Sequence, residues 1–220
     1  MKVDGSLWTI TVIGCLIAAV APFDVNFAAL AGNSAPLRVL MTLLMIGVGV
    51  LAGKTVGLRI EGHGARHPVF IGALAALMVA LYVTLIDCTL FRSALSATYV
   101  RSLQLPLFDR LLAYTMRAFL ETLIYRLFVF SVLLWALWRL KIRGPWALFA
   151  AALVSQCLCV WTNVVALEHV TPANLFYDGL RYVAPGVLWS WLYSRFGFTT
   201  TEISHVGCHV ILQPMFSVFL

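Results

Sequence analysis

The chain is a succession of apolar stretches about 20 residues long, separated by short segments that carry charge, glycine or proline. A helix rises about 1.5 Å per residue, so about 20 apolar residues are needed to cross about 30 Å of hydrocarbon. We therefore predict an all-α protein, a polytopic bundle of about seven transmembrane helices. The predicted helices cover residues 7–30, 37–56, 68–91, 111–140, 145–167, 175–193 and 201–220.

Two stretches modify this pattern. Pro22, Asp24 and Asn26 interrupt the first apolar stretch, which predicts either a kinked helix or a helix that ends near residue 21. Residues 93–110 form the longest connection, and we expect this segment to lie along the membrane interface as an amphipathic helix.

Composition excludes a soluble domain. Of the 220 residues, 62% are hydrophobic and 11% are charged, whereas soluble proteins average roughly 45–50% apolar and about 25% charged residues. The net charge is +6, and most Lys and Arg residues lie in the connections, as the positive-inside rule describes. We therefore expect a single integral membrane domain over residues 1–220, with the lipid bilayer as its partner and no nucleic acid bound. A chain of this size suits a multi-pass protein of a bacterial inner membrane.

Ionisable residues at membrane depth are concentrated in the second half of the chain. A charge near the bilayer centre costs at least about 2.5 kcal/mol on insertion scales, so such residues indicate a functional site. We therefore predict scaffold helices and a connection over residues 1–110, and motif-bearing helices over residues 111–220. The ionisable residues of the second part are Arg117, Glu121, Arg126, Glu168, His169, Asp178, Arg181, Glu202, His205 and His209.

Arg126 requires an anion from outside its own helix. Glu121 lies five residues earlier, so the two side chains point about 140° apart on an α-helix. Asp87, Glu168 and Asp178 are the candidates for this anion.

The acids and imidazoles of this half suit one kind of chemistry. A carboxylate such as that of Glu121, in a site of low dielectric constant, can act as a general base that takes a proton from water. Two imidazoles opposite it can donate hydrogen bonds to the oxyanion that develops on a bound carbonyl. The set therefore predicts hydrolysis within the bilayer.

Three short motifs carry a family resemblance. Glu121-Thr-Leu-Ile-Tyr-Arg126 looks like an EExxxR motif, Val165-Ala-Leu-Glu-His169 resembles FxxxH, and His205-Val-Gly-Cys-His209 resembles HxxxN. Residues 181–197 are similar to the glycine-rich LY segment that precedes the last motif. Over residues 118–213 the chain thus resembles the CAAX protease and bacteriocin-processing family, glutamate-dependent intramembrane proteases that include type II CAAX prenyl endopeptidases.

The resemblance implies roles for three residues. Glu121 is the water-activating base, His169 is a second catalytic group near the attacked carbonyl, and His205 helps to bind the oxyanion. The implied activity is an intramembrane endopeptidase that hydrolyses a peptide bond in or near a membrane-anchored protein segment, in protein maturation or sorting. The expected partner is therefore a membrane-anchored protein or peptide substrate.

The motifs depart from the family pattern at three positions. Thr122 stands at the second glutamate, Val165 at the phenylalanine and His209 at the asparagine. Thr122 leaves Arg126 without an anion one turn earlier, and His209 replaces the amide donor only in the appropriate tautomer or when protonated. We assign Thr122, Arg126 and His209 supporting roles.

Several of these residues also have purely structural interpretations. Glu121 can pair with Arg117 one turn earlier as an ordinary ion pair. His169 can interact with the carboxyl end of its helix, because a cation is favoured there. Glu202 lies three residues after Thr199, which is the spacing of a capping box, and we favour this interpretation for Glu202.

Two other functions stay open. His205 and His209 have the i,i+4 spacing of a zinc-binding helix, and Glu121, Glu202 or His169 can complete a metal-dependent hydrolase site. The chain lacks HExxH, however, and we expect no metal or other cofactor. The second alternative is a non-catalytic polytopic membrane protein of the binding or immunity type, which the changed motifs favour.

Overall fold

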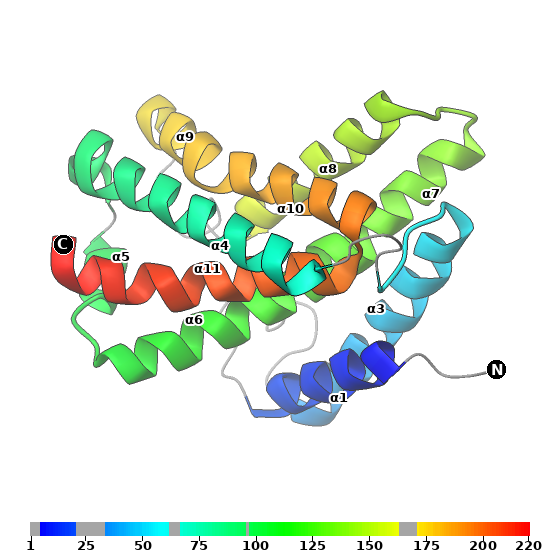
Figure 1. Cartoon of the computed structure of the whole chain (residues 1–220), viewed down its shortest axis with the longest axis horizontal. Coiled ribbons are helices and arrows are strands. Elements are labelled where there is room, and N and C mark those ends of the chain that lie inside the picture. The colour runs from blue at the N-terminus through cyan, green and yellow to red at the C-terminus, as the bar shows by residue number, and fades with distance from the viewer. Residues whose placement is uncertain (1–4, 21–33, 62–66, 96, 163–170) are drawn as a thin grey trace.

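The computed structural model describes residues 5–20, 34–61, 67–95, 97–162 and 171–220, and these residues form helices and turns with no strand among them (Figure 1). The α-helices are α1 (Gly5–Val20), α3 (Ala35–Thr55), α4 (Pro68–Leu85), α5 (Ala97–Ser102), α6 (Leu107–Glu121), α7 (Ser131–Arg139), α8 (Pro145–Val160), α9 (Pro172–Asp178), α10 (Ala184–Phe196) and α11 (Phe198–Phe219). The prediction of an all-α protein is confirmed.

Wider or tighter helical turns extend several of these helices. The segments η1 (Ile86–Leu90), η3 (Thr122–Phe130) and η5 (Gly179–Val183) are π-helical, and η2 (Arg92–Ala94) is a 3-10 helix. Segment η1 continues α4, η3 joins α6 to α7, and η5 joins α9 to α10. The helix therefore continues through each π-helical segment, but the side chains beyond the segment are rotated about the helix axis relative to an unbroken α-helix.

Three described helices are long and apolar enough to cross a membrane: Ala35–Thr55, Pro68–Leu90 and Leu107–Arg139. Helices α1 and α8 are also apolar, at 16 residues each. Residues 21–30 of the first predicted helix lie outside the described residues, and α1 ends at Val20.

The segment 93–110 differs from the expected single interfacial helix. It is divided between the end of η2, α5 and the start of α6, which begins at Leu107. Pro106 directly precedes α6, and proline disfavours a helical conformation in the residue before it, so the chain turns here.

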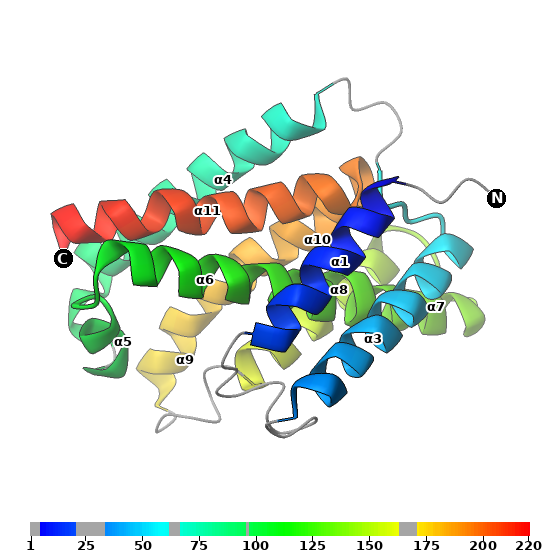
Figure 2. The ribbon, with the colours of Figure 1, turned by 90° about the horizontal axis from the view of Figure 1, so that it is seen from below.

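Helix α11 lies between α4 and α6 and contacts both (Figures 1 and 2). Its approach to α4 depends on small residues. A Cβ atom at Gly72 would lie 2.9 Å from the carbonyl oxygen of Thr200 and from Cγ2 of Ile203, and one at Gly207 would lie 3.2 Å from Cβ of Ala76. Small residues let helix backbones approach closely in the absence of a hydrophobic driving force.

Helix α11 runs antiparallel to α6 and η3 (Figure 2). Arg110 near the start of α6 donates to the Ser217 hydroxyl near the end of α11, and Thr122 at the start of η3 contacts His205 in the middle of α11. The numbers of facing residues therefore rise on one helix as they fall on the other. This register decides which polar groups of the second half can meet.

Each π-helical segment carries a buried charged residue, namely Asp87, Arg126 and Arg181. The Arg181 guanidinium contacts the Asp87 carboxylate, with Nη2 2.8 Å from Oδ2 and Nε 2.9 Å from Oδ1, and the Tyr177 hydroxyl donates to Oδ1 at 2.9 Å. This pairing corrects the expectation that Asp87 is a candidate anion for Arg126, because its oxygens are already bound. Glu168, another of those candidates, lies outside the described residues.

Candidate functional site

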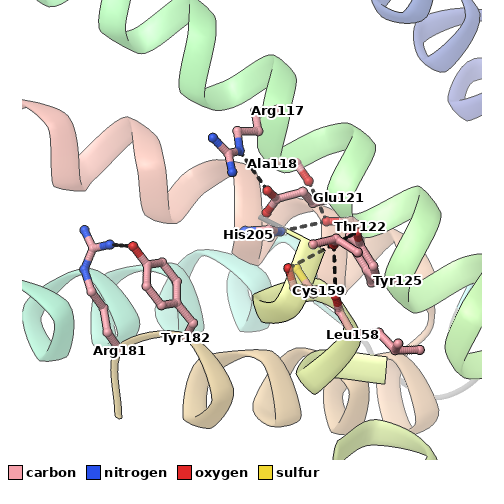
Figure 3. A network of polar contacts seen from close by, with 11 residues as sticks. Arg117, Ala118, Glu121, Thr122, Tyr125, Leu158, Cys159, Arg181, Tyr182 and His205 are labelled. Atoms are coloured by element: carbon pink, nitrogen blue, oxygen red, sulfur yellow. Dashed lines mark hydrogen bonds and ion pairs between the residues drawn. The ribbon is translucent and has the colours of Figure 1, made fainter. Parts of the chain in front are cut away.

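Glu121 is the last residue of α6, directly before η3. Arg117 Nε donates to Glu121 Oε1 at 2.9 Å, so the structural interpretation of this acid as an i,i+4 ion pair is confirmed (Figure 3). The Glu121 side chain is 17% exposed and that of Arg117 is 48% exposed. An ion pair with one half-exposed partner contributes only a few tenths of a kcal/mol and exchanges readily.

Thr122 joins the start of η3 to α11. Its Oγ1 lies 2.9 Å from Nδ1 of His205, and the same hydroxyl donates to the carbonyl oxygen of Ala118 at 2.9 Å (Figure 3). Because a hydroxyl has one proton, Nδ1–H of the imidazole is the donor to Thr122. The neutral ring is therefore the Nδ1–H tautomer, whose Nε2 is an acceptor and becomes a donor only when the ring is protonated.

His209 lies one turn beyond His205, and the two ring centroids are 5.5 Å apart. Its ring stacks on Tyr114 of α6 at 5.7 Å with an interplanar angle of 15°. The buried Nδ1 of His209 has no hydrogen-bond partner among the described residues. Both imidazoles therefore lie on the side of α11 that faces the end of α6.

Four of the predicted site residues thus come together, namely Glu121, Thr122, His205 and His209. They are brought together by two elements, the junction of α6 with η3 and the middle of α11. His169, predicted as a second catalytic group, lies outside the described residues.

Arg126 lies one turn beyond Thr122 and is 1% exposed. One of its nitrogens, Nη2, donates to Oε1 of Gln156 on α8, and its guanidinium carbon lies 5.2 Å from the ring centroid of Trp189 on α10. Nε and Nη1 have no hydrogen-bond partner among the described residues. Trp189 also packs against His205, with ring centroids 3.8 Å apart and the rings tilted by 31°, so one indole contacts both the guanidinium and an imidazole.

Glu202 does not form the predicted capping box. The carbonyl oxygens of Arg59 and Ile60 accept the backbone N–H groups of Phe198 and Thr199, at 3.0 and 3.1 Å, so the first turn of α11 already has its acceptors. Glu202 instead points into the protein at 8% exposure, and neither carboxylate oxygen has a hydrogen-bond partner among the described residues.

Sequence reasoning missed two residues of this region, namely Gln156 and Trp189, and it assigned Glu202 to a helix cap. Gln156 and Trp189 are an uncharged and an aromatic residue in apolar helices, and neither carries a signal in the sequence. Glu202 did carry one, because it lies on the same stripe of α11 as His205 and His209.

The metal interpretation gains no ligand set. Among the described residues, no group of three or more His, Cys, Asp and Glu side chains converges on a point where a metal ion would bind. Nδ1 of His205 is already bound to Thr122, which leaves that ring a single nitrogen for any other partner.

No protein-family model, curated protein or solved structure matches the chain. The described residues form an all-helical protein with three long apolar helices, and buried polar side chains lie inside it.

Proposed function

We propose that this protein is an intramembrane endopeptidase of the glutamate type, similar to the CAAX protease and bacteriocin-processing family. The observation that carries the proposal is the convergence of one partly exposed acid, Glu121, with two imidazoles, His205 and His209, on facing helices. An acid and two imidazoles are the groups that water activation and oxyanion stabilisation require.

The proposed hydrolysis uses these groups in the following order. Glu121 exchanges its Arg117 partner for a water molecule and takes one proton from it, and the hydroxide forms a bond to the carbonyl carbon while the π electrons move to oxygen. The oxyanion then re-forms the C=O bond as the C–N bond breaks, and the proton held by Glu121 passes to the leaving amine, so that the products are an acid and an amine.

The imidazoles stabilise the oxyanion in this scheme. Since Nδ1–H of His205 is bound to Thr122, His205 donates to the oxyanion through Nε2 when the ring is protonated. His209 is a second donor in this scheme, because its Nδ1 has no hydrogen-bond partner among the described residues. His169 is proposed as a further catalytic group on the strength of its motif.

The proposed setting is the cell membrane of a bacterium, with about seven helices crossing it. The substrate is a peptide bond close to the end of a membrane-anchored segment, and the process is protein maturation or sorting. The three long apolar helices support the membrane setting, and α1 and α8 supply additional apolar length.

Cleavage of a membrane-anchored reporter tests this proposal. Purified chain in nanodiscs is incubated with a single-span reporter, and the products are identified by mass spectrometry. Glu121→Gln abolishes cleavage, and His205→Ala and His169→Ala lower it by a factor of about 10² or more. Arg117→Gln is the matched control, because it removes the ion pair and leaves the acid, so cleavage persists. Cleavage that survives Glu121→Gln refutes the mechanism.

A second candidate is a non-catalytic membrane binding protein. The Arg117–Glu121 ion pair favours it, because an acid bound to a neighbouring guanidinium does not need a chemical role. Under this alternative no reporter is cleaved, and a partner copurifies equally with the wild type and with Glu121→Gln.

A further inference from the structure

Arg126 and Glu202 are opposite charges that lie buried with incomplete hydrogen bonding. Two nitrogens of the guanidinium and both oxygens of the carboxylate have no hydrogen-bond partner among the described residues. Four such atoms in one region are unusual, because an unpaired buried charge costs several kcal/mol. Either each charge has a partner outside the described residues, or the two charges are partners of each other.

The antiparallel register places the two charges opposite each other. Thr122 contacts His205 across the two helices. Arg126 lies four residues after Thr122, and Glu202 lies three residues before His205. On antiparallel helices both steps lead one turn in the same direction along the bundle.

We infer that Glu202 is the counter-anion of Arg126, joined to it through buried water, and that the pair is a positioning element for His205. Water is required because the two side chains do not hydrogen-bond directly, and a buried water makes about three hydrogen bonds to groups that otherwise lack partners. The contact fixes η3 against α11 one turn away from Thr122, and so holds the His205 ring in place with its Nδ1–H bound to Thr122. This last role rests on the proposed function, whereas the charge pair does not.

Infrared difference spectroscopy tests the charge state. In spectra of the full chain in nanodiscs, the wild type minus Glu202→Gln difference contains the band of an ionised carboxylate. A protonated carboxyl band in its place overturns the pairing. A high-resolution density map of the same sample contains ordered water between the two side chains, and a dry gap overturns the bridge.

Thermal unfolding of single and double variants tests the coupling. Glu202→Gln leaves a buried guanidinium without its anion, so the Tm falls on the order of 10 °C. The loss in the Glu202→Gln/Arg126→Gln double variant is smaller than the sum of the two single losses. The Asp87→Asn/Arg181→Gln cycle supplies the scale for a directly bonded buried pair. Additive losses at Arg126 and Glu202 overturn the inference.

Kinetics separate this inference from the proposed function. Glu202→Gln lowers kcat for reporter cleavage by about 10²-fold with little change in KM, because a displaced catalytic group affects the transition state, and Glu202→Asp restores most of the rate. An unchanged kcat in Glu202→Gln overturns the positioning role. If cleavage instead survives Glu121→Gln, the proposed function fails, while the spectroscopic and thermal results still decide the pair.

Discussion

Gly186→Ala separates the packing of Arg126 from its charge. A Cβ atom at residue 186 would overlap the side chain of Gln156, whose Oε1 accepts a hydrogen bond from Arg126 Nη2. Gln156, a residue of α8, is 4% exposed and its side chain contacts α10 and η3, so it has little space into which to move. The added methyl therefore displaces the amide, and Arg126 loses its one described hydrogen bond.

The expected cost combines two effects. Overpacking a well-packed interior costs about 1–3 kcal/mol, and removing a buried hydrogen bond to a charged group costs about 1.5–3 kcal/mol. Since the amide of Gln156 can still rotate to relieve part of the overlap, we expect Gly186→Ala to lower the free energy of unfolding by about 2–4 kcal/mol.

A double-mutant cycle checks this reasoning. Unfolding is measured in mixed detergent micelles for Gly186→Ala, for Gln156→Ala and for the double variant. In the Gln156→Ala background the methyl at residue 186 has space, so its cost falls to nearly zero and the two changes are strongly non-additive. Equal costs of Gly186→Ala in both backgrounds would refute the proposed contact.

Two further predictions follow from helix packing and from the site. Gly49→Ala destabilises the protein by about 2–4 kcal/mol, because its Cβ would overlap the backbone of η3. Gly47→Ala on the same helix meets no atom within 4 Å, so it is neutral or slightly stabilising in the same unfolding assay. Equal effects of the two substitutions would contradict the close approach of α3 to η3. Thr122→Val removes the acceptor for Nδ1–H of His205 at nearly constant volume, so it lowers the free energy of unfolding by about 1–3 kcal/mol and moves the ¹⁵N chemical shifts of that imidazole; unchanged shifts would show that the hydrogen bond is absent.

Local sequence determined the helical class and the long apolar helices. The predicted ranges 37–56, 68–91 and 111–140 correspond to Ala35–Thr55, Pro68–Leu90 and Leu107–Arg139. The length of an apolar run and the proline that begins α4 are local properties, and in lipid each helix satisfies its own backbone hydrogen bonds, so these elements do not depend on their neighbours. The ion pair between Arg117 and Glu121 was foreseeable for the same reason, because both residues lie on one helix one turn apart.

Only the tertiary structure decided which charges meet across helices. Asp87, a candidate for Arg126 in the sequence, pairs with Arg181, and Glu202 faces inward where a helix cap was predicted. Such pairings depend on helix order, rotation and register, and the π-helical turns alter the rotation in a way that no 3.6-residue period reveals. The carbonyl oxygens of Arg59 and Ile60, 139 residues earlier in the chain, accept the backbone N–H groups of Phe198 and Thr199 at the start of α11. Glu202 therefore does not cap this helix and faces the interior. Contacts between distant segments, and not between neighbouring residues, therefore give Asp87 and His205 their partners.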